Sequence, residues 1–239
     1  MSLICVIGAR AGSEGLVGKN IRPLLGKPLI SWSIEQALES KIVDRLVVST
    51  DSSEIAEIAK DAGAEVPFLR PKDLSTSDVG KFQVWKHALI ACEEHFKETY
   101  DTFVDLDCTN PLRDASDICA AVRQFEKTRA RGVNAVFTVS EARKNPYFNL
   151  VEPDSHGALR MSKSLPETVI ARQHAPSVRE HVASIYVLAS EYVKTANHLL
   201  DGHAEGYDIG VSKSFDVDSE FDFELIEYLM KKKFRTPHG

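Results

Sequence analysis

The sequence predicts an α/β protein in which helices cover both faces of a mostly parallel, twisted sheet. Short apolar segments rich in Val and Ile alternate along the chain with amphipathic segments of helical period. A glycine-rich loop directly follows the first apolar segment, at the end of a strand where α/β proteins of this kind bind ligands. With 239 residues and 43% apolar side chains, the chain can bury a substantial core. We therefore expect one domain, residues 1–239, that carries an insertion.

The first half of the chain alternates expected strands with expected helices. The strands are predicted at residues 3–8, 45–50, 65–68 and 102–106. The helices are predicted at residues 28–40, 52–62, 81–96 and 116–128. In the second of these helices the apolar residues recur at helical spacing, Ser52 can cap the start and Gly63 can end it. Because helices connect the strands, we expect parallel pairing, with the carboxyl ends of the strands at one edge of the sheet.

The second half of the chain contains the expected insertion. Strands are predicted at residues 135–139, 184–188 and 208–211, and helices near residues 191–198 and 219–234. Between residues 140 and 182 the alternation breaks, because four prolines interrupt a segment rich in Arg, Lys and His. We expect residues 140–182 to form an arm. The last helix is expected to bury an apolar stripe made of Phe221, Leu225, Tyr228 and Leu229.

Composition excludes several classes of protein. The net charge is −6 and no basic stripe is present, which argues against nucleic acid as a partner. No apolar run approaches the roughly 20 residues that cross a bilayer, and no basic region precedes the first apolar stretch. The four cysteines form no CxxC pair and show no regular spacing with the histidines, so neither a zinc site nor a disulfide framework is indicated. We expect a soluble, cytoplasmic protein without a membrane partner.

Residues 7–20, with the sequence IGARAGSEGLVGKN, carry the strongest local signal for function. Their four glycines permit positive φ and close backbone approach, and the N–H groups of such a turn can converge on an anion. Arg10 adds a bidentate donor and Lys19 a mobile point charge, two complementary ways to hold phosphate. The loop matches neither the Walker A pattern nor GxGxxG. The alternative to a phosphate-binding loop is an ordinary strand-to-helix connection with solvated basic residues.

Asp216 and Asp218 form an acidic pair just before the last expected helix. In an extended segment, residues two apart point to the same side, roughly 6 to 7 Å from each other. Two carboxylates so placed can share a hard cation, and Mg²⁺ prefers one or two carboxylates together with substrate phosphates and water. The alternative is that Asp218 caps the last helix and Asp216 is a solvated loop residue.

Residues 106–113, with the sequence LDCTNPLR, follow the strand expected at 102–106. Asp107 and Thr109 are therefore expected at the edge of the sheet where ligands bind, and Arg113 near the start of the next helix. Asp107 directly follows an apolar segment, where burying a carboxylate without a partner is costly. The alternative is the ordinary chemistry of a strand-to-helix turn.

Several segments, taken together and in order, resemble the acylneuraminate cytidylyltransferases, also called CMP-sialate synthetases. These segments are ARAGSEGLVGKNIRPLLGKPLI, VVSTDSSEIAEIAKDAGAEVPFLRP, DCTNPLR, the pair Arg172–Gln173, SIYV and FDVDSEFDF. The resemblance spans nearly the whole chain. It implies a fold like that of the nucleotide-diphospho-sugar transferases. It also implies an inserted dimerisation segment at residues 140–182, so that the protein would be a homodimer.

The reaction that the resemblance implies joins CTP to an acidic sugar. CMP would be transferred to the anomeric hydroxyl of a nine-carbon 2-keto-3-deoxy sugar acid of the sialic, legionaminic or pseudaminic type, with release of pyrophosphate. The hydroxyl would attack the α-phosphorus in line, so no covalent intermediate on the protein is required. Mg²⁺, or another divalent cation, would neutralise charge on the phosphates.

The resemblance also implies roles for individual residues. Catalysis is assigned to Arg10, Lys19, Asp216 and Asp218, and the two aspartates are also the metal ligands. The nucleotide site is assigned to Ala9, Arg10, Ala11, Gly12, Ser13, Lys19, Asn20, Arg70 and Lys81. The sugar site is assigned to Asp107, Thr109, Arg113, Arg172, Gln173 and Tyr186. Without the motifs, surface salt bridges would explain Arg70 and Arg172, and core packing would explain Tyr186.

Some positions depart from the family pattern and leave other functions open. Glu14 adds a negative charge to the expected triphosphate site, and Lys81 and Asp107 also differ from the usual residues. In the sugar region, Glu180 and Val182 replace an Arg and an Asn. One alternative is a CTP-binding regulatory or interaction module that has lost turnover. Another is an enzyme that transfers CMP to an eight-carbon 3-deoxy-octulosonate.

Overall fold

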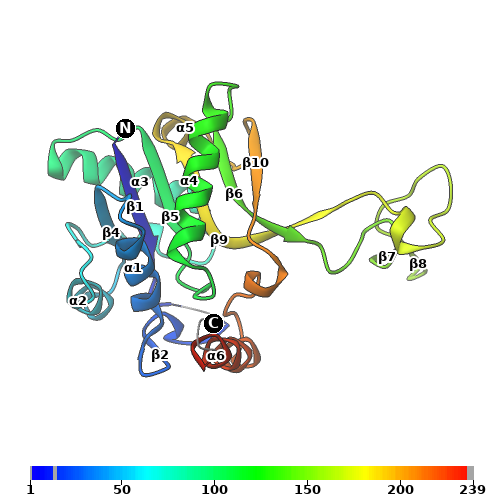
Figure 1. Cartoon of the computed structure of the whole chain (residues 1–239), viewed down its shortest axis with the longest axis horizontal. Coiled ribbons are helices and arrows are strands. Elements are labelled where there is room, and N and C mark those ends of the chain that lie inside the picture. The colour runs from blue at the N-terminus through cyan, green and yellow to red at the C-terminus, as the bar shows by residue number, and fades with distance from the viewer. Residues whose placement is uncertain (1, 13–14, 236–239) are drawn as a thin grey trace.

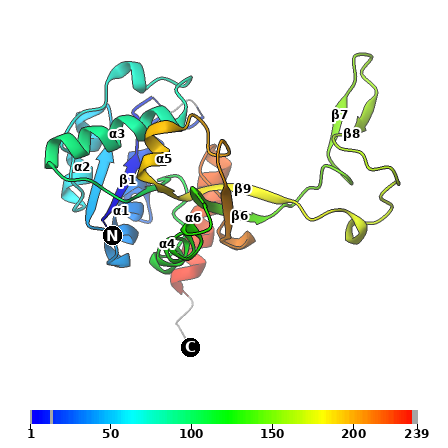
Figure 2. The ribbon, with the colours of Figure 1, turned by 90° about the horizontal axis from the view of Figure 1, so that it is seen from above.

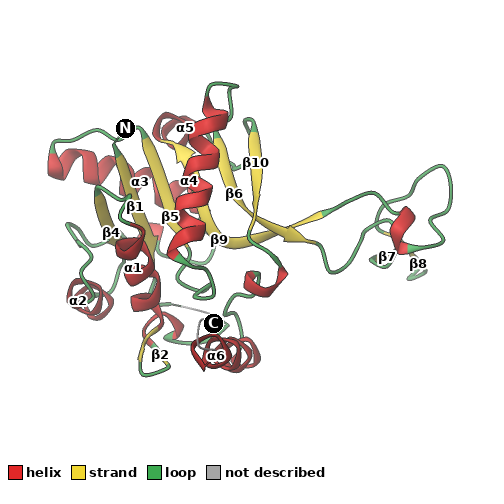
Figure 3. Ribbon diagram, viewed as in Figure 1, coloured by secondary structure: helices red, strands yellow, loops and turns green. Residues whose placement is uncertain are grey.

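The computed structural model describes residues 2–12 and 15–235. Among these residues, six strands form the main sheet in the order β10-β6-β9-β5-β1-β4. They are β1 (Leu3–Gly8), β4 (Arg45–Ser49), β5 (Thr102–Leu106), β6 (Ala135–Glu141), β9 (Arg179–Ala189) and β10 (Ala204–Asp208). The helices are α1 (Leu29–Ser40), α2 (Ser53–Asp61), α3 (Lys81–Phe96), α4 (Ala115–Arg129), α5 (Ser190–Thr195) and α6 (Glu220–Arg235). Figure 3 distinguishes the helices from the strands.

Within residues 2–12 and 15–235, the shorter elements are two hairpins and four 3₁₀ helices. The hairpins pair β2 (Pro23–Leu24) with β3 (Lys27–Pro28), and β7 (Val151–Pro153) with β8 (Leu159–Met161). The 3₁₀ helices are η1 (Lys19–Ile21), η2 (Lys72–Leu74), η3 (Arg172–His174) and η4 (Val211–Lys213).

The sheet is mostly parallel, as the sequence predicts. β1 pairs in parallel with β4 and β5, and β10 pairs in parallel with β6. β9 lies between β5 and β6 and is antiparallel to both. Because β1, β4 and β5 run in the same direction, their carboxyl ends meet at the edge of the sheet nearest to α6 (Figure 1). This is the edge where ligands are expected.

Helices cover both faces of the sheet and create two main cores. On one face α1, α2 and α4 contribute apolar side chains such as Ile34, Ile55 and Phe125. On the other face α3 and α5 contribute Trp85 and Val193. Figures 1 and 2 show α4 and α3 on opposite sides of the sheet. A third, smaller core joins α6 to the β2–β3 region and to the segment before α4.

Local sequence explains where the helices begin. The Ser52 side chain accepts a hydrogen bond from the backbone N–H of Ile55 and caps α2. At α4, Asp114 and Asp117 form a reciprocal capping box. Pro28 precedes α1, where a missing N–H costs nothing. Each predicted helix is therefore present, with bounds that differ by a few residues.

Two strand predictions need correction. The strand expected at 65–68 reduces to a single bridge between Val47 and Glu65. The strand expected at 208–211 occurs earlier, as β10, because Gly210 adopts positive φ and η4 follows it. The segment before Asp208 contains Gly206, which weakens its strand signal in the sequence, although its pairing with Phe137 needs no side chain.

The buried face predicted for the last helix is only partly correct, because Leu229 packs against the third core whereas Phe221 and Tyr228 are exposed. Phe223, Ile226 and Met230 are buried, whereas the side chains of Phe221 and Tyr228 are 71% and 63% exposed. Helix α6 has two apolar stripes of equal period, so periodicity alone does not distinguish them. The stripe that contacts Leu24, Leu29, Leu112 and Val217 is the one that is buried.

The arm leaves the main sheet between β6 and β9. The two strands remain paired as far as Glu141 and Arg179, so the excursion spans residues 142–178 and the ends of the expected arm belong to the sheet. Figures 1 and 2 show it projecting away from the rest of the molecule, with the β7–β8 hairpin near its tip. No helix within the described residues is long and apolar enough to span a membrane.

Candidate active site

A cleft of about 400 Å³ lies at the carboxyl edge of the sheet. Six separate segments line it: β1 with the loop after it, the segment after α2, the start of α3, β5 with the loop after it, Ala183 of β9 and the segment before α6. Their polar lining residues are Arg10, Lys19, Asn20, Arg70, Lys81, Asp105, Asp107, Thr109, Asp216 and Asp218. Ser13 and Glu14, which the sequence also places here, lie outside the described residues.

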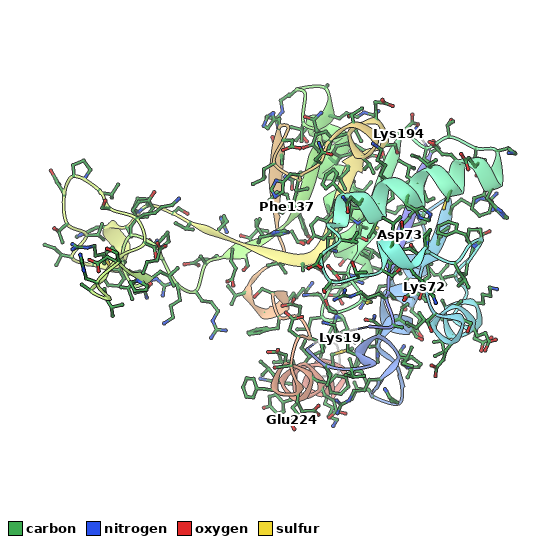
Figure 4. All side chains as sticks on the ribbon, turned by 180° about the vertical axis from the view of Figure 1, so that it is seen from behind. Lys19, Lys72, Asp73, Phe137, Lys194 and Glu224 are labelled. Atoms are coloured by element: carbon green, nitrogen blue, oxygen red, sulfur yellow. The ribbon has the colours of Figure 1, made fainter. Side chains whose placement is uncertain are left out.

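The glycine-rich loop contacts the acidic segment directly, although about 200 residues separate them in the sequence. The Lys19 ammonium donates to the backbone carbonyl of Val217 at 2.7 Å and pairs with the Asp218 carboxylate at 2.9 Å. A Cβ placed on Gly15 would lie 2.4 Å from the backbone oxygen of Asp218, so a side chain there would collide with it. Figure 4 labels Lys19 between the sheet and α6. The loop cations and the acidic segment therefore face one cleft.

The loop backbone is held by hydrogen bonds within the protein. The N–H of Ala9 donates to Ser49, and that of Ala11 donates to the Asp51 carboxylate at 2.9 Å. The Asn20 amide donates to the carbonyl of Arg10 at 3.0 Å. Two of the N–H groups expected to face an anion are thus already occupied. Among the four loop glycines, the structure gives positive φ at Gly18, with a value of 68°.

Arg70 supplies a second guanidinium at the basic end of the cleft. It is almost completely buried, and its Nε donates to the hydroxyl of Ser75 at 3.1 Å. Burial lowers the pKa of Arg70, Asp51 opposes this effect, and the positive charge of Arg10 adds to it. A buried guanidinium that lies beside another cation is suited to binding an anionic ligand.

The opposite end of the cleft is acidic. The Lys81 ammonium pairs with Asp105 at 3.1 Å and with Asp107 at 2.6 Å, and it lies 4.8 Å from the centroid of the Tyr186 ring. Burial lowers the pKa of Lys81, but the two carboxylates outweigh it and raise the pKa well above its usual value. Lys81 therefore neutralises the buried carboxylate of Asp105 and is already engaged before any ligand arrives.

Asp216 faces the cleft between Lys19 and the acidic end. Burial, together with the negative charges of Asp218 and Asp107, raises the pKa of Asp216 to about 6. Among the described residues, no group of three or more His, Cys, Asp or Glu side chains is arranged to hold a metal ion. Two carboxylates whose charges repel each other are a donor set that suits Mg²⁺ with phosphate and water as further ligands. The residues present therefore fit the predicted cation.

Four residues assigned to the sugar do not line the cleft. Arg113 is fully buried, and its guanidinium donates to the carbonyls of Asp107 and Asn110 at 2.7 Å each. Tyr186 is also buried, with its ring centroid 4.8 Å from the Lys81 ammonium, and it is not among the residues that line the cleft. Arg172 and Gln173 lie in the arm, where they line a separate groove. Within one chain, Asp107 and Thr109 are the members of that set that reach the cleft.

The sequence interpretation missed three residues that shape the site. Asp105 lies in β5, two residues before Asp107, and this spacing directs both carboxylates to the same side, where each pairs with Lys81. The Cys108 thiol donates to the side-chain oxygen of Asn20 at 3.0 Å, and Asp51 holds the loop backbone. The acid inside an apolar strand was a usable signal for Asp105. No local pattern distinguishes Asp51 from a helix-capping residue.

Comparison with known proteins identifies the family. Residues 4–234 match the family model described as Cytidylyltransferase. The CMP-N,N'-diacetyllegionaminic acid synthase of Campylobacter jejuni is 38% identical, over 98% of this chain and 97% of that protein. The N-acylneuraminate cytidylyltransferase of Escherichia coli is 30% identical over 98% of this chain, which spans 53% of that protein.

A solved structure supports the fold. The CMP:2-keto-3-deoxy-manno-octonic acid synthetase, complexed with CTP, aligns with a TM-score of 0.73 over 98% of this chain and 100% of that chain. Its sequence identity is 16%, so the likeness concerns the fold alone. The α/β fold and the family resemblance predicted from the sequence are both confirmed. This chain belongs to the cytidylyltransferase family, together with the N-acylneuraminate cytidylyltransferases and the CMP-N,N'-diacetyllegionaminic acid synthases.

Proposed function

We propose that the protein transfers CMP from CTP to the anomeric hydroxyl of a nine-carbon 2-keto-3-deoxy sugar acid and releases pyrophosphate. The observation that carries the proposal is that the cations of the glycine-rich loop and the Asp216–Asp218 pair line a single cleft. A polyphosphate with its divalent cation requires both kinds of group in one place. The relatives named for diacetyllegionaminic and acylneuraminic acids support an acidic sugar as the acceptor.

The residues of the cleft can perform the proposed reaction by positioning and by charge. The anomeric oxygen attacks the α-phosphorus and releases its proton to solvent. The bond between the α-phosphorus and the bridging oxygen breaks, and its electron pair leaves with pyrophosphate. Arg10 and Lys19 would offset the charge on the phosphate oxygens, and Arg70 would hold the nucleotide at the buried end. Displacement at phosphorus needs no nucleophile from the protein, in keeping with a cleft built from charged groups.

Asp216 and Asp218 would hold a divalent cation, with Mg²⁺ as the first candidate. Bound there, the cation would neutralise negative charge on the phosphates and stabilise the departing pyrophosphate. The Lys19 contact with Asp218 fixes the orientation of that carboxylate beside the loop. Burial, together with the negative charges of Asp218 and Asp107, raises the pKa of Asp216, and a cation bound there would oppose this effect.

The acidic end of the cleft is the proposed site of the acceptor. Asp107 retains a partly exposed carboxylate that can accept hydrogen bonds from sugar hydroxyls or an amide N–H. Its partner Lys81 stays with the carboxylates, so we assign Lys81 to the acceptor end and no longer to the phosphates.

We also propose a homodimer in which Arg172 and Gln173 of one arm serve the cleft of the partner. Because CTP is an intracellular nucleotide, the reaction would take place in the cytoplasm.

A coupled pyrophosphate assay tests this function. The purified chain is incubated with CTP, Mg²⁺ and, separately, acylneuraminic, diacetyllegionaminic, pseudaminic and 3-deoxy-octulosonic acids. We expect pyrophosphate release with at least one nine-carbon acid and none when the divalent cation is chelated. Turnover with the eight-carbon acid alone would assign a different acceptor. CTP binding without pyrophosphate release from any of these acids would instead support the regulatory module.

A further inference from the structure

We propose that Asn110 is a positioning residue that holds the Asp216–Asp218 segment against the edge of the sheet. The proposal rests on the function proposed above, in which that segment carries the divalent cation. Asn110 lies in the β5–α4 loop, is fully buried and does not line the cleft. Its effect on the cation would therefore be exerted through the backbone that precedes the two aspartates.

The Asn110 amide group spans the start of the acidic segment. Its Nδ2 donates to the carbonyl of Lys213 at 2.8 Å and to the carbonyl of Phe215 at 2.9 Å. Phe215 immediately precedes Asp216, so this second bond orients the peptide unit from which the Asp216 side chain departs. Both donors of the amide are thus used on one short stretch of backbone.

Neighbouring bonds continue the same anchorage toward Asp218. The N–H of Val217 donates to the carbonyl of Thr109 at 2.8 Å, and the carbonyl of Val217 accepts from Lys19 at 2.7 Å. Asn110 and Thr109 are adjacent in the sequence, so the β5–α4 loop holds this segment at three points. Backbone held in this way carries both aspartates into the cleft with little freedom to turn.

Asn110 is itself held rigidly. Its Oδ1 accepts from the hydroxyl of Ser184 on β9 at 3.1 Å, and its backbone carbonyl accepts from the Arg113 guanidinium at 2.7 Å. These partners define which side of the amide carries the nitrogen. The two carbonyls accept hydrogen bonds and so must face the NH₂ group, whereas the Ser184 hydroxyl can donate to the amide oxygen. This explains why Arg113 is buried: it supports the loop and lies out of reach of the substrate.

The chemistry of the proposed reaction makes this anchorage important. Two like-charged carboxylates repel each other, and without a fixed backbone they would separate when no cation is present. Residues that orient metal ligands typically change metal affinity or activity by about 10- to 100-fold when they are replaced. Asparagine suits this position because it offers two donors without adding charge to an acidic region.

The test compares Asn110→Ala and the milder Asn110→Ser with the wild-type protein. Pyrophosphate release is measured against Mg²⁺ concentration at saturating CTP and acceptor, and deuterium uptake is measured for residues 213–218 without metal. We expect the Mg²⁺ concentration for half-maximal rate to rise by about 10- to 100-fold in Asn110→Ala and less in Asn110→Ser. The KM for the acceptor should change by less than about twofold, because Asn110 is absent from the cleft lining. Deuterium uptake of the segment should increase in both variants.

Two control variants separate positioning from a general loss of stability. Ser184→Ala removes the bond to Oδ1 and leaves both bonds to the acidic segment intact. Val193→Ala creates a cavity in the core on the α3 side of the sheet, outside the cleft lining. Val193→Ala should lower the melting temperature without changing the Mg²⁺ requirement. Ser184→Ala should raise that requirement less than Asn110→Ala does, because both bonds from Nδ2 to the acidic segment remain. An unchanged Mg²⁺ requirement and unchanged deuterium uptake in Asn110→Ala would overturn the proposal. If the wild-type protein releases no pyrophosphate, the proposed function fails, whereas deuterium uptake still tests the anchorage.

Discussion

Single residues connect the two halves of the candidate site. Lys19 and Gly15 both contact the backbone around Asp218, one through an ammonium group and the other through the absence of a side chain. Charge alone would draw the loop and the acidic segment together, but only a glycine permits this backbone approach. The loop glycines therefore have different roles, since a Cβ on Gly12 would meet no described residue within 4 Å.

This difference predicts that adding a methyl group at Gly15 and at Gly12 has different effects on stability. Gly15→Ala should lower the free energy of unfolding by roughly 1–3 kcal/mol, because its Cβ must displace the Asp218 backbone. Gly12→Ala, in the same loop, should change it by less than about 0.5 kcal/mol. Urea unfolding of both variants measures the difference. Equal stabilities would show that the loop does not contact the acidic segment in solution.

At the scale of elements, Asp114 joins three parts of the fold. It caps α4, and its carboxylate pairs with Lys213 of η4 at 2.7 Å and with Lys233 of α6. Burial opposes ionisation, but the two ammonium groups outweigh it and hold the pKa of Asp114 below its usual value of 3.8. This cluster connects the two elements that flank the acidic segment of the cleft.

The sign of this pKa shift predicts how stability depends on pH. Because the pKa is lower in the folded state, the ion pairs stabilise the fold above pH 3.8 and are lost as the pH falls below that value. Asp114→Asn retains a capping side chain. Its free energy of unfolding should nevertheless be lower than that of the wild type by on the order of 1 kcal/mol near neutral pH. Urea unfolding at neutral pH and near pH 3 checks this. The difference in free energy of unfolding between variant and wild type should shrink as the pH falls toward 3. A difference that does not shrink would point to the cap instead of the charges.

At the scale of the whole molecule, the arm is the part on which the proposed homodimer depends. It carries exposed apolar side chains, with Leu159 69% and Ile170 85% accessible, around a two-stranded hairpin. Such a hairpin is marginally stable alone. Arg172 and Gln173 also lie in the arm and not in the cleft of the same chain. A partner copy would both cover the apolar side chains and receive these two residues.

Complementation between inactive variants tests this arrangement. Lys19→Ala and Arg172→Ala should each be inactive alone, because one lacks the phosphate cation and the other the arm residue. After subunit exchange, half of the dimers should be mixed and each should hold one intact site, giving about a quarter of wild-type activity. Pyrophosphate release after mixing measures the recovery, and light scattering measures the mass. If mixed dimers form but recover no activity, Arg172 does not act in the cleft of the partner subunit.

The sequence alone determined the alternation of strands and helices, because local periodicity and capping residues specify these elements. It also determined the family and the charged residues at the carboxyl edge, since several motifs occur in order along the chain. Only the tertiary structure decided which stripe of α6 is buried, how β9 is paired, and that Arg113 supports a loop below the cleft. These features depend on contacts between residues far apart in the chain. The meeting of Gly15 with Asp218 is of this kind, because neither residue carries a local signal of the other.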